Sequence, residues 1–137
     1  MKKAKRTCLF ALEAEENFAL LFDNFAELEV DLLRLAEHSL IWKDRPREHS
    51  ESMQDRLLLD RRIVDLLTSC RLYLDQSEHG LSTLFGNPSD QLHAFKGSRR
   101  NLYDSHWGYR LMEALRNHVQ HASLAAHAIT HGGFLSS

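Results

Sequence analysis

Apolar residues recur every three or four positions along most of this chain, and that spacing constrains its fold more than any other feature. Between Glu13 and Trp42 the recurring residues are Phe18, Leu21, Phe22, Phe25, Leu28, Leu32, Leu35 and Leu40. A period near 3.6 places such residues along one side of an α-helix. The segment is therefore predicted to form an amphipathic helix, whose solvent face carries Glu16, Asp23, Glu27, Asp31 and Glu37.

The same spacing predicts three further helices. The second spans about residues 51–82, where Gly80 weakens its end. Asn87 is expected to cap a third helix whose first residue is Pro88. The fourth pattern is helical again and places His118 on its apolar side; its recurring residues are Trp107, Leu111, Leu115, His118 and Ala122.

Four helical segments with short connections predict an all-α fold, an up-and-down bundle of four to five helices. Only residues 7–10 resemble a strand, and no second segment offers a pairing partner. The 137 residues are expected to form one domain, with a basic segment at 1–12 and a flexible tail at 132–137.

Charge is distributed unevenly along the chain. Residues 13–42 carry eight acidic side chains against Arg34 alone, although the net charge is only −2. From Pro88 onward three acidic residues face five basic ones, which are Lys96, Arg99, Arg100, Arg110 and Arg116. We therefore expect an anionic partner to dock near the C-terminal third.

The cysteine count and the lack of long apolar runs limit the cellular location that the sequence predicts. Cys8 and Cys70 are too few to indicate a disulfide framework, and Cys70 falls in an apolar helical pattern typical of a reduced core thiol. No run has the length of a signal peptide or a membrane span. The expected location is cytoplasmic, without a membrane partner.

One polar cluster interrupts the fourth helical pattern, at Arg116-Asn117-His118-Val119-Gln120-His121. An arginine binds phosphate through a fork of donors, a histidine transfers protons near neutral pH, and an amide orients either group. Arg116, Asn117 and His121 together suit the attack of a ribose 2′-hydroxyl on the adjacent phosphodiester, with no cofactor or metal. Because Arg116 and His121 are about 140° apart around an ideal helix, a site shared by two copies is easier to build.

Two other interpretations of these residues remain open. Arg116 and His121 also fit a plain surface pair at a helix end. His127 and His131 are four positions apart, so with His121 they fit a metal site on a helix.

The run from Tyr109 to His121, YRLMEALRNHVQH, resembles the signature segment of the HEPN superfamily (higher eukaryotes and prokaryotes nucleotide-binding domains). Its motif is an arginine, a polar residue and a histidine four to six residues beyond the arginine, places filled here by Arg116, Asn117 and His121. Residues 61–75 are similar to the second helix of bacterial members. The resemblance implies a dimeric helical bundle with metal-independent endoribonuclease activity, as in toxin, phage-defence and CRISPR-associated members. Some members instead bind nucleotides or proteins without cleaving RNA.

The predicted function is therefore that of a homodimeric endoribonuclease that leaves 2′,3′-cyclic phosphate ends on RNA, with Arg116, Asn117 and His121 as its catalytic residues. An antitoxin or regulatory protein is a further expected partner. The alternative is a non-catalytic module that binds a nucleotide or a protein. The residues expected to contact the substrate are Tyr109, Arg110, Gln120, Arg99 and Arg100.

Overall fold

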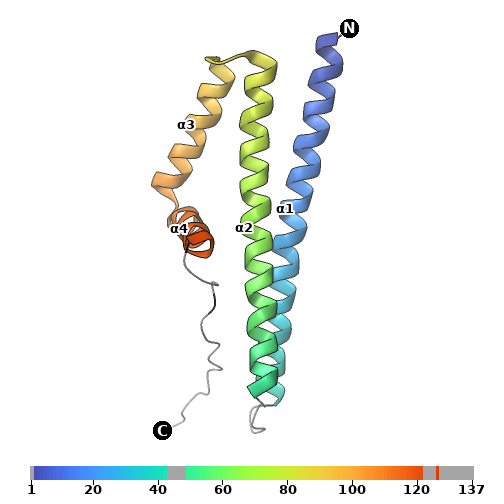
Figure 1. Cartoon of the computed structure of the whole chain (residues 1–137), viewed down its shortest axis with the longest axis vertical. Coiled ribbons are helices and arrows are strands. Elements are labelled where there is room, and N and C mark those ends of the chain that lie inside the picture. Colours follow the sequence, from blue (N-terminus) through green and yellow to red (C-terminus); the bar gives the residue numbers. More distant parts are fainter. Residues whose placement is uncertain (1, 43–48, 122–125, 127–137) are drawn as a thin grey trace.

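The computed structural model describes residues 2–42, 49–121 and 126, and it contains four helices in that part of the chain. They are α1 (Lys2–Ile41), α2 (His49–Phe85), α3 (Asp90–Ser105) and α4 (Trp107–His121). Figure 1 shows α1 and α2 as a long antiparallel hairpin, with α3 beside one end of α2. The predicted all-α fold is confirmed, because each helix contacts the next as in an up-and-down bundle. None of the described helices has an apolar stretch sufficient to cross a bilayer.

One side of α1 packs on α2 through residues whose spacing in the sequence alternates between four and three positions. The members of this seam are partly or fully buried, and they are Phe10, Ala14, Asn17, Leu21, Asn24, Leu28, Asp31 and Leu35. Such alternation is the coiled-coil spacing that keeps one seam against a partner helix. Asn24 also donates from Nδ2 to the carbonyl of Asp65 on α2, at 3.4 Å.

Asp31 belongs to this seam, and the prediction that it faces solvent is wrong. Its position follows Asn24 and Leu28 at the seam spacing, and its side chain is 7% exposed. On α2, Arg62 donates from Nε to Oδ2 of Asp31 at 2.7 Å and also pairs with Glu27. The hydrogen bond to Asp31 raises the pKa of Arg62; burial opposes this, and the charges of Glu27 and Asp31 add to the rise.

The first two helices are longer than their apolar patterns predict. Helix α1 begins at Lys2 rather than Glu13, so residues 7–10 are helical and not a strand. Helix α2 continues through Gly80 to Phe85. A Cβ atom at Gly80 would lie 2.1 Å from Cδ2 of Phe10, so this glycine admits the Phe10 ring rather than weakening the helix end.

The start of α3 also differs from the prediction, because Ser89 caps the helix instead of Asn87. Ser89 has extended backbone angles, and its Oγ accepts a hydrogen bond from the backbone N–H of Leu92 at 3.3 Å. The turn before it uses Gly86 at a φ of 90°, a value that favours glycine. Helix α3 thus begins at Asp90 rather than Pro88.

The hydrophobic core is centred on α2, and part of the predicted α1 stripe lies outside it. The buried apolar side chains in the described residues are Leu59, Leu66, Leu67 and Leu92. Leu21, Leu28 and Leu35 of the predicted stripe are in the α1–α2 seam, but the other members are exposed or only half covered; these are Phe18, Phe22, Phe25, Leu32 and Leu40. The reason is that α1 contacts no described helix other than α2.

A candidate site between α2 and α4

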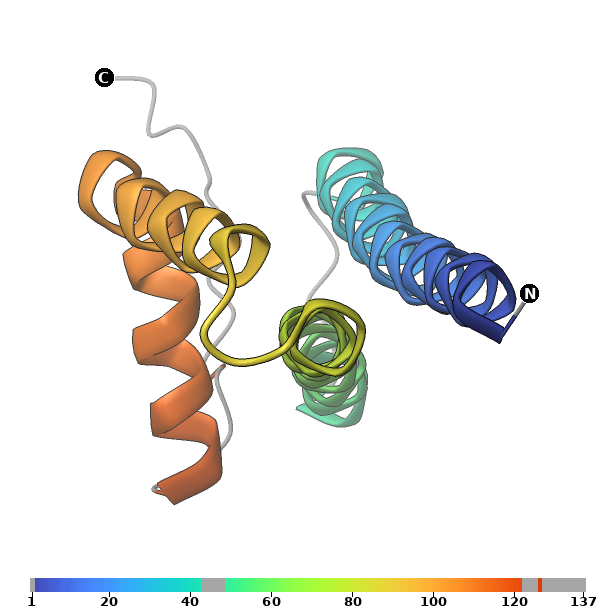
Figure 2. The same cartoon turned by 90° about the horizontal axis from the view of Figure 1, so that it is seen from above.

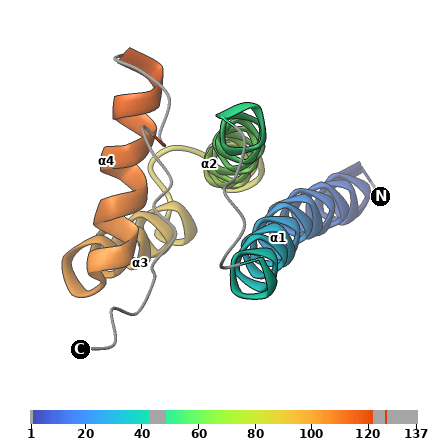
Figure 3. The same cartoon turned by 90° about the horizontal axis from the view of Figure 1, so that it is seen from below.

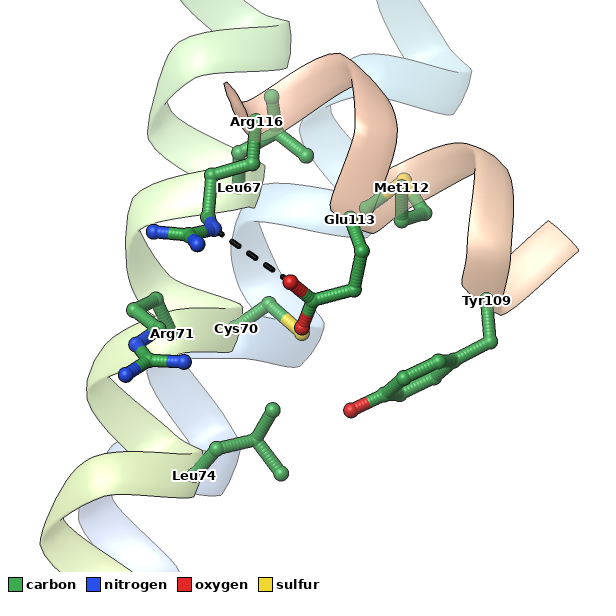
Figure 4. Close-up of a pocket in the computed structure, with 8 residues that line it drawn as sticks. All are labelled: Leu67, Cys70, Arg71, Leu74, Tyr109, Met112, Glu113 and Arg116. Atoms are coloured by element: carbon green, nitrogen blue, oxygen red, sulfur yellow. Dashed lines mark ion pairs between the residues drawn. The ribbon is translucent and has the colours of Figure 1, made fainter. Parts of the chain in front are cut away.

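Helix α4 runs across α2, and the side chain of Arg116 extends from it toward α2 (Figures 2 and 4). Its Nη2 donates to Oδ1 of Asn117 at 3.0 Å, and its Nη1 donates to Oε1 of Gln120 at 3.1 Å. The structure therefore brings together three of the residues that the sequence singled out. The Arg116 side chain is 24% exposed, so it is accessible at the edge of the packing.

Arg116 borders a groove of about 430 Å³ between α2 and α4. Arg71 from α2 lines the same groove, and both arginines also line the small adjoining pocket drawn in Figure 4. Arg71 pairs through Nε with Oδ2 of Asp75 at 2.7 Å. The other groove residues are Val64, Leu67, Thr68, Leu72, Gln76, Val119 and Gln120. Two guanidinium groups from different helices thus share one open groove.

A chain of ion pairs connects this groove to α3. Nε of Arg116 lies 3.6 Å from Oε2 of Glu113, and Oε1 of Glu113 lies 3.8 Å from Nη2 of Arg99. Arg99 also pairs with Glu78 on α2 at 3.6 Å, and Lys96 pairs with the same carboxylate at 3.0 Å. The alternating charges hold α2, α3 and α4 together around the site.

A second recess, of about 460 Å³, lies on the α3 side of α4. The predicted substrate residues Arg99, Arg100 and Tyr109 line it together with Lys96. Burial lowers the pKa of Arg99, but the Tyr109 hydroxyl and the carboxylates of Glu113 and Glu78 outweigh it, so the pKa is raised and the side chain stays charged. The buried Tyr109 hydroxyl faces this guanidinium without hydrogen-bond geometry, and it has no hydrogen-bond partner in the described structure.

Arg110, also predicted to bind substrate, is occupied elsewhere. Its Nη1 donates to the backbone carbonyls of Tyr103 at 3.2 Å and Asp104 at 2.8 Å. These carbonyls are in the last turn of α3, where a cation satisfies oxygens that lack helical partners. Arg110 thus fastens α3 to α4 and lines neither the groove nor the recess.

The histidines of α4 are placed differently from one another. His121 is the last residue of α4, and its side chain lies outside the described residues. Its position is four residues beyond Asn117, which makes the two neighbours on the surface of a helix. His118 is exposed rather than packed on the apolar side of α4, and Trp107 is 70% exposed.

The possible metal site cannot be placed, because His127 and His131 fall outside the described residues. Within the described part of the chain, no group of three or more His, Cys, Asp or Glu side chains is positioned to hold a metal ion.

Two further residues of the site were not singled out from the sequence. Arg71 and Asp75 form an i,i+4 ion pair on α2. The sequence could have indicated them, because two opposite charges four positions apart stand beside the apolar residues Leu67 and Leu74. Cys70, which lines the pocket in Figure 4, has its pKa raised by burial and then by the charge of Glu113, with Arg99 opposing. A raised pKa keeps the thiol protonated and therefore a poor nucleophile.

No protein-family model, curated protein or solved structure matches the chain. The geometry around Arg116, together with the motif that contains it, is therefore the basis for a functional assignment.

Proposed function

We propose that this protein is a metal-independent endoribonuclease of the HEPN type, in which Arg116, Asn117 and His121 act on one phosphodiester. The observation that carries the proposal is the placement of Arg116. Its guanidinium is held by Asn117 and Gln120 beside a groove that also contains Arg71. A phosphate of the RNA backbone would bind there by replacing Asp75 and Glu113, which pair with Arg71 and Arg116, as the anionic partner of the two guanidinium groups.

In the proposed reaction the ribose 2′-oxygen attacks the adjacent phosphorus atom. A new O2′–P bond forms, the P–O5′ bond breaks, and the 5′-oxygen leaves with a proton, so the products are a 2′,3′-cyclic phosphate and a 5′-hydroxyl. Arg116 stabilises the charge that accumulates on the phosphorane oxygens. His121 transfers the proton, and Asn117 positions the guanidinium or the imidazole.

The recess next to α3 supports binding of the rest of the strand. Lys96, Arg99 and Arg100 line it together with Glu78 and Glu113, so these side chains leave one net positive charge, which favours a phosphate of any sequence in a salt-dependent manner. Tyr109 offers a ring at the same recess, and single-stranded bases stack on such rings.

The offset between Arg116 and His121 on α4 favours a site completed by a second copy of the chain. A homodimer would place two motifs near one strand, so that each copy supplies groups to the same phosphodiester. A toxin or phage-defence effector controlled by an antitoxin or regulatory protein is the biological role that this activity suits.

Cleavage of a structured RNA by the purified full chain in EDTA tests the proposal. The parent protein is expected to cut, and Arg116→Ala and His121→Ala are each expected to slow cleavage by about 10²- to 10⁴-fold. His118→Ala is the matched control, because this exposed side chain lies on the same helix. If the parent binds RNA without cutting it, the non-catalytic module is the better description; equal rates for parent and Arg116→Ala exclude the assigned role.

A further inference from the structure

A row of apolar side chains lies exposed along one flank of α1. We call it the α1 stripe; it consists of Phe18, Phe22, Phe25, Leu32, Leu33 and Leu40, which are 43–74% exposed. Steps of four and three join Phe18, Phe22 and Phe25; the row then passes Glu29 and continues on the same flank with Leu32, Leu33 and Leu40, roughly 90° around the helix from the seam that contacts α2. Contiguous apolar surface of this kind marks an interaction site.

Phe18 lies edge-on to Tyr73 of α2, with ring centroids 5.8 Å apart, but the described part of the chain leaves the α1 stripe largely exposed. Helix α1 contacts α2 and neither α3 nor α4. Figure 3 shows α1 on one side of α2, with α3 and α4 on another. A helix of 40 residues is thus packed on a single neighbour.

A second exposed apolar patch lies where α3 meets α4. We call it the α3–α4 corner; it consists of Leu102, Tyr103, Trp107 and Leu111, which are 45–70% exposed. It contains two of the aromatic residue types, Trp and Tyr, that are enriched at the centres of protein interfaces.

Charge identifies the surface that fits the α1 stripe. Residues 13–42 carry eight acidic side chains and one arginine, so a pair of α1 helices would bring like charges together. Glu29 occupies the stripe spacing between Phe25 and Leu32, is exposed, and has no ion pair in the described structure. Arg100, on α3 near the α3–α4 corner, is likewise exposed and unpaired among the described residues. The stripe thus carries Glu29, and Arg100, Asp104 and Arg110 at the corner leave one net positive charge to meet it.

We propose that the α1 stripe docks on the α3–α4 corner of a second copy of this chain. A twofold axis repeats the contact: the α1 stripe of each copy packs on the α3–α4 corner of the other. Both apolar surfaces are then covered in a closed dimer. The inference identifies the surface through which two copies meet, and it does not depend on RNA cleavage. Arg100 and Tyr103 also line the recess proposed to bind RNA, so a docked α1 covers one edge of that recess. The mass of the protein in solution tests the dimer, and the RNA products test the nuclease. Either proposal can therefore fail without the other.

The first test is the mass of the full chain in solution, by light scattering after gel filtration over a dilution series. The parent is expected to dimerise, and Phe22→Glu and Trp107→Glu are each expected to give monomers with unchanged helical circular dichroism. Leu20→Glu is the matched control, because Leu20 is 46% exposed and about 200° around α1 from Phe22. A monomeric parent, or a Phe22→Glu variant that dimerises as well as Leu20→Glu, overturns the proposal.

A charge-reversal cycle tests which surfaces meet. Glu29→Lys and Arg100→Glu are each expected to weaken the dimer by at least about fivefold at low salt, because each places like charges opposite one another. Both changes in one chain restore the opposite charges in a swapped order, so the double variant is expected to regain parental affinity. If the two losses add instead of cancelling, stripe and corner do not face each other and the proposal is wrong.

Discussion

Nε of Arg62 on α2 donates a 2.7 Å hydrogen bond to Oδ2 of Asp31, which lies in the C-terminal part of the α1–α2 seam. The Asp31 side chain is 7% exposed, so water does not replace a lost partner. This contact joins positions far apart in the chain and sets the register of the two long helices against each other. Its loss would leave the buried carboxylate with Arg34 alone, whose Nη1 lies 3.5 Å from Oδ1 of Asp31 and whose side chain is exposed.

Arg62→Leu is therefore expected to lower the thermal unfolding temperature more than Arg61→Leu does. Arg61 is the neighbouring exposed arginine and has no ion pair in the described structure. Circular dichroism at the helical minimum measures both variants. Equal unfolding temperatures for the two would mean that the Asp31 contact adds no net stability.

Gly80 is expected to resist replacement although it lies inside a helix. Gly80→Ala sets a methyl group against the Phe10 ring and should cost about 1–3 kcal/mol in the free energy of unfolding. Gly97 in α3 has open space at the same position, so Gly97→Ala should stabilise by about 0.5–1 kcal/mol. Urea unfolding measures both changes, and a stabilising Gly80→Ala would show that Phe10 moves aside freely.

Arg71 is expected to contact RNA phosphate in the groove beside Arg116. If it does, Arg71→Ala weakens RNA binding and lowers the magnitude of the slope of log affinity against log salt by about 0.7, the value for one contact to a single strand. Fluorescence anisotropy at several salt concentrations gives this slope. Arg61→Ala, which is outside the groove, should leave it unchanged; the same slope for parent and Arg71→Ala would remove Arg71 from the RNA site.

The two cysteines are expected to react at different rates. Cys8 is exposed, whereas burial raises the pKa of Cys70 above its usual value of 9.0. Iodoacetamide should therefore label Cys8 first, and labelling of Cys70 should increase only above that usual pKa. Because folding raises this pKa, the stability that the protonated thiol contributes is lost as the pH rises through the folded value. Mass spectrometry of the peptides measures each site, and equal labelling near neutral pH would contradict the burial of Cys70.

The sequence was sufficient for the helices but not for their partners. Spacings of three and four predict a helix whichever neighbour it meets, so the all-α fold followed from pattern alone. The pattern did not separate Leu21 and Leu28, which pack on α2, from Phe22 and Phe25, which are exposed. Asp31 was misplaced for the same reason, since a polar residue in a seam is recognised only through its partner Arg62.

The candidate site was predictable to the extent that it follows one helix. Arg116, Asn117 and Gln120 are close in sequence, and the structure joins their side chains. Arg71 comes from another helix, so its presence in the groove depends on how α4 crosses α2. Arg110 illustrates the converse, because a basic side chain suited to phosphate is instead bound to the end of α3.

The central claim is that the ribose 2′-hydroxyl is the nucleophile at a site formed by Arg116, Asn117 and His121. The most direct measurement compares cleavage, in EDTA, of one RNA with the same sequence carrying 2′-O-methyl riboses, with product ends determined by mass spectrometry. The account predicts that only the unmodified RNA is cut and that its 3′ ends carry 2′,3′-cyclic phosphate. Equal cutting of both strands, 3′-hydroxyl ends, or no cutting of the unmodified RNA would contradict it.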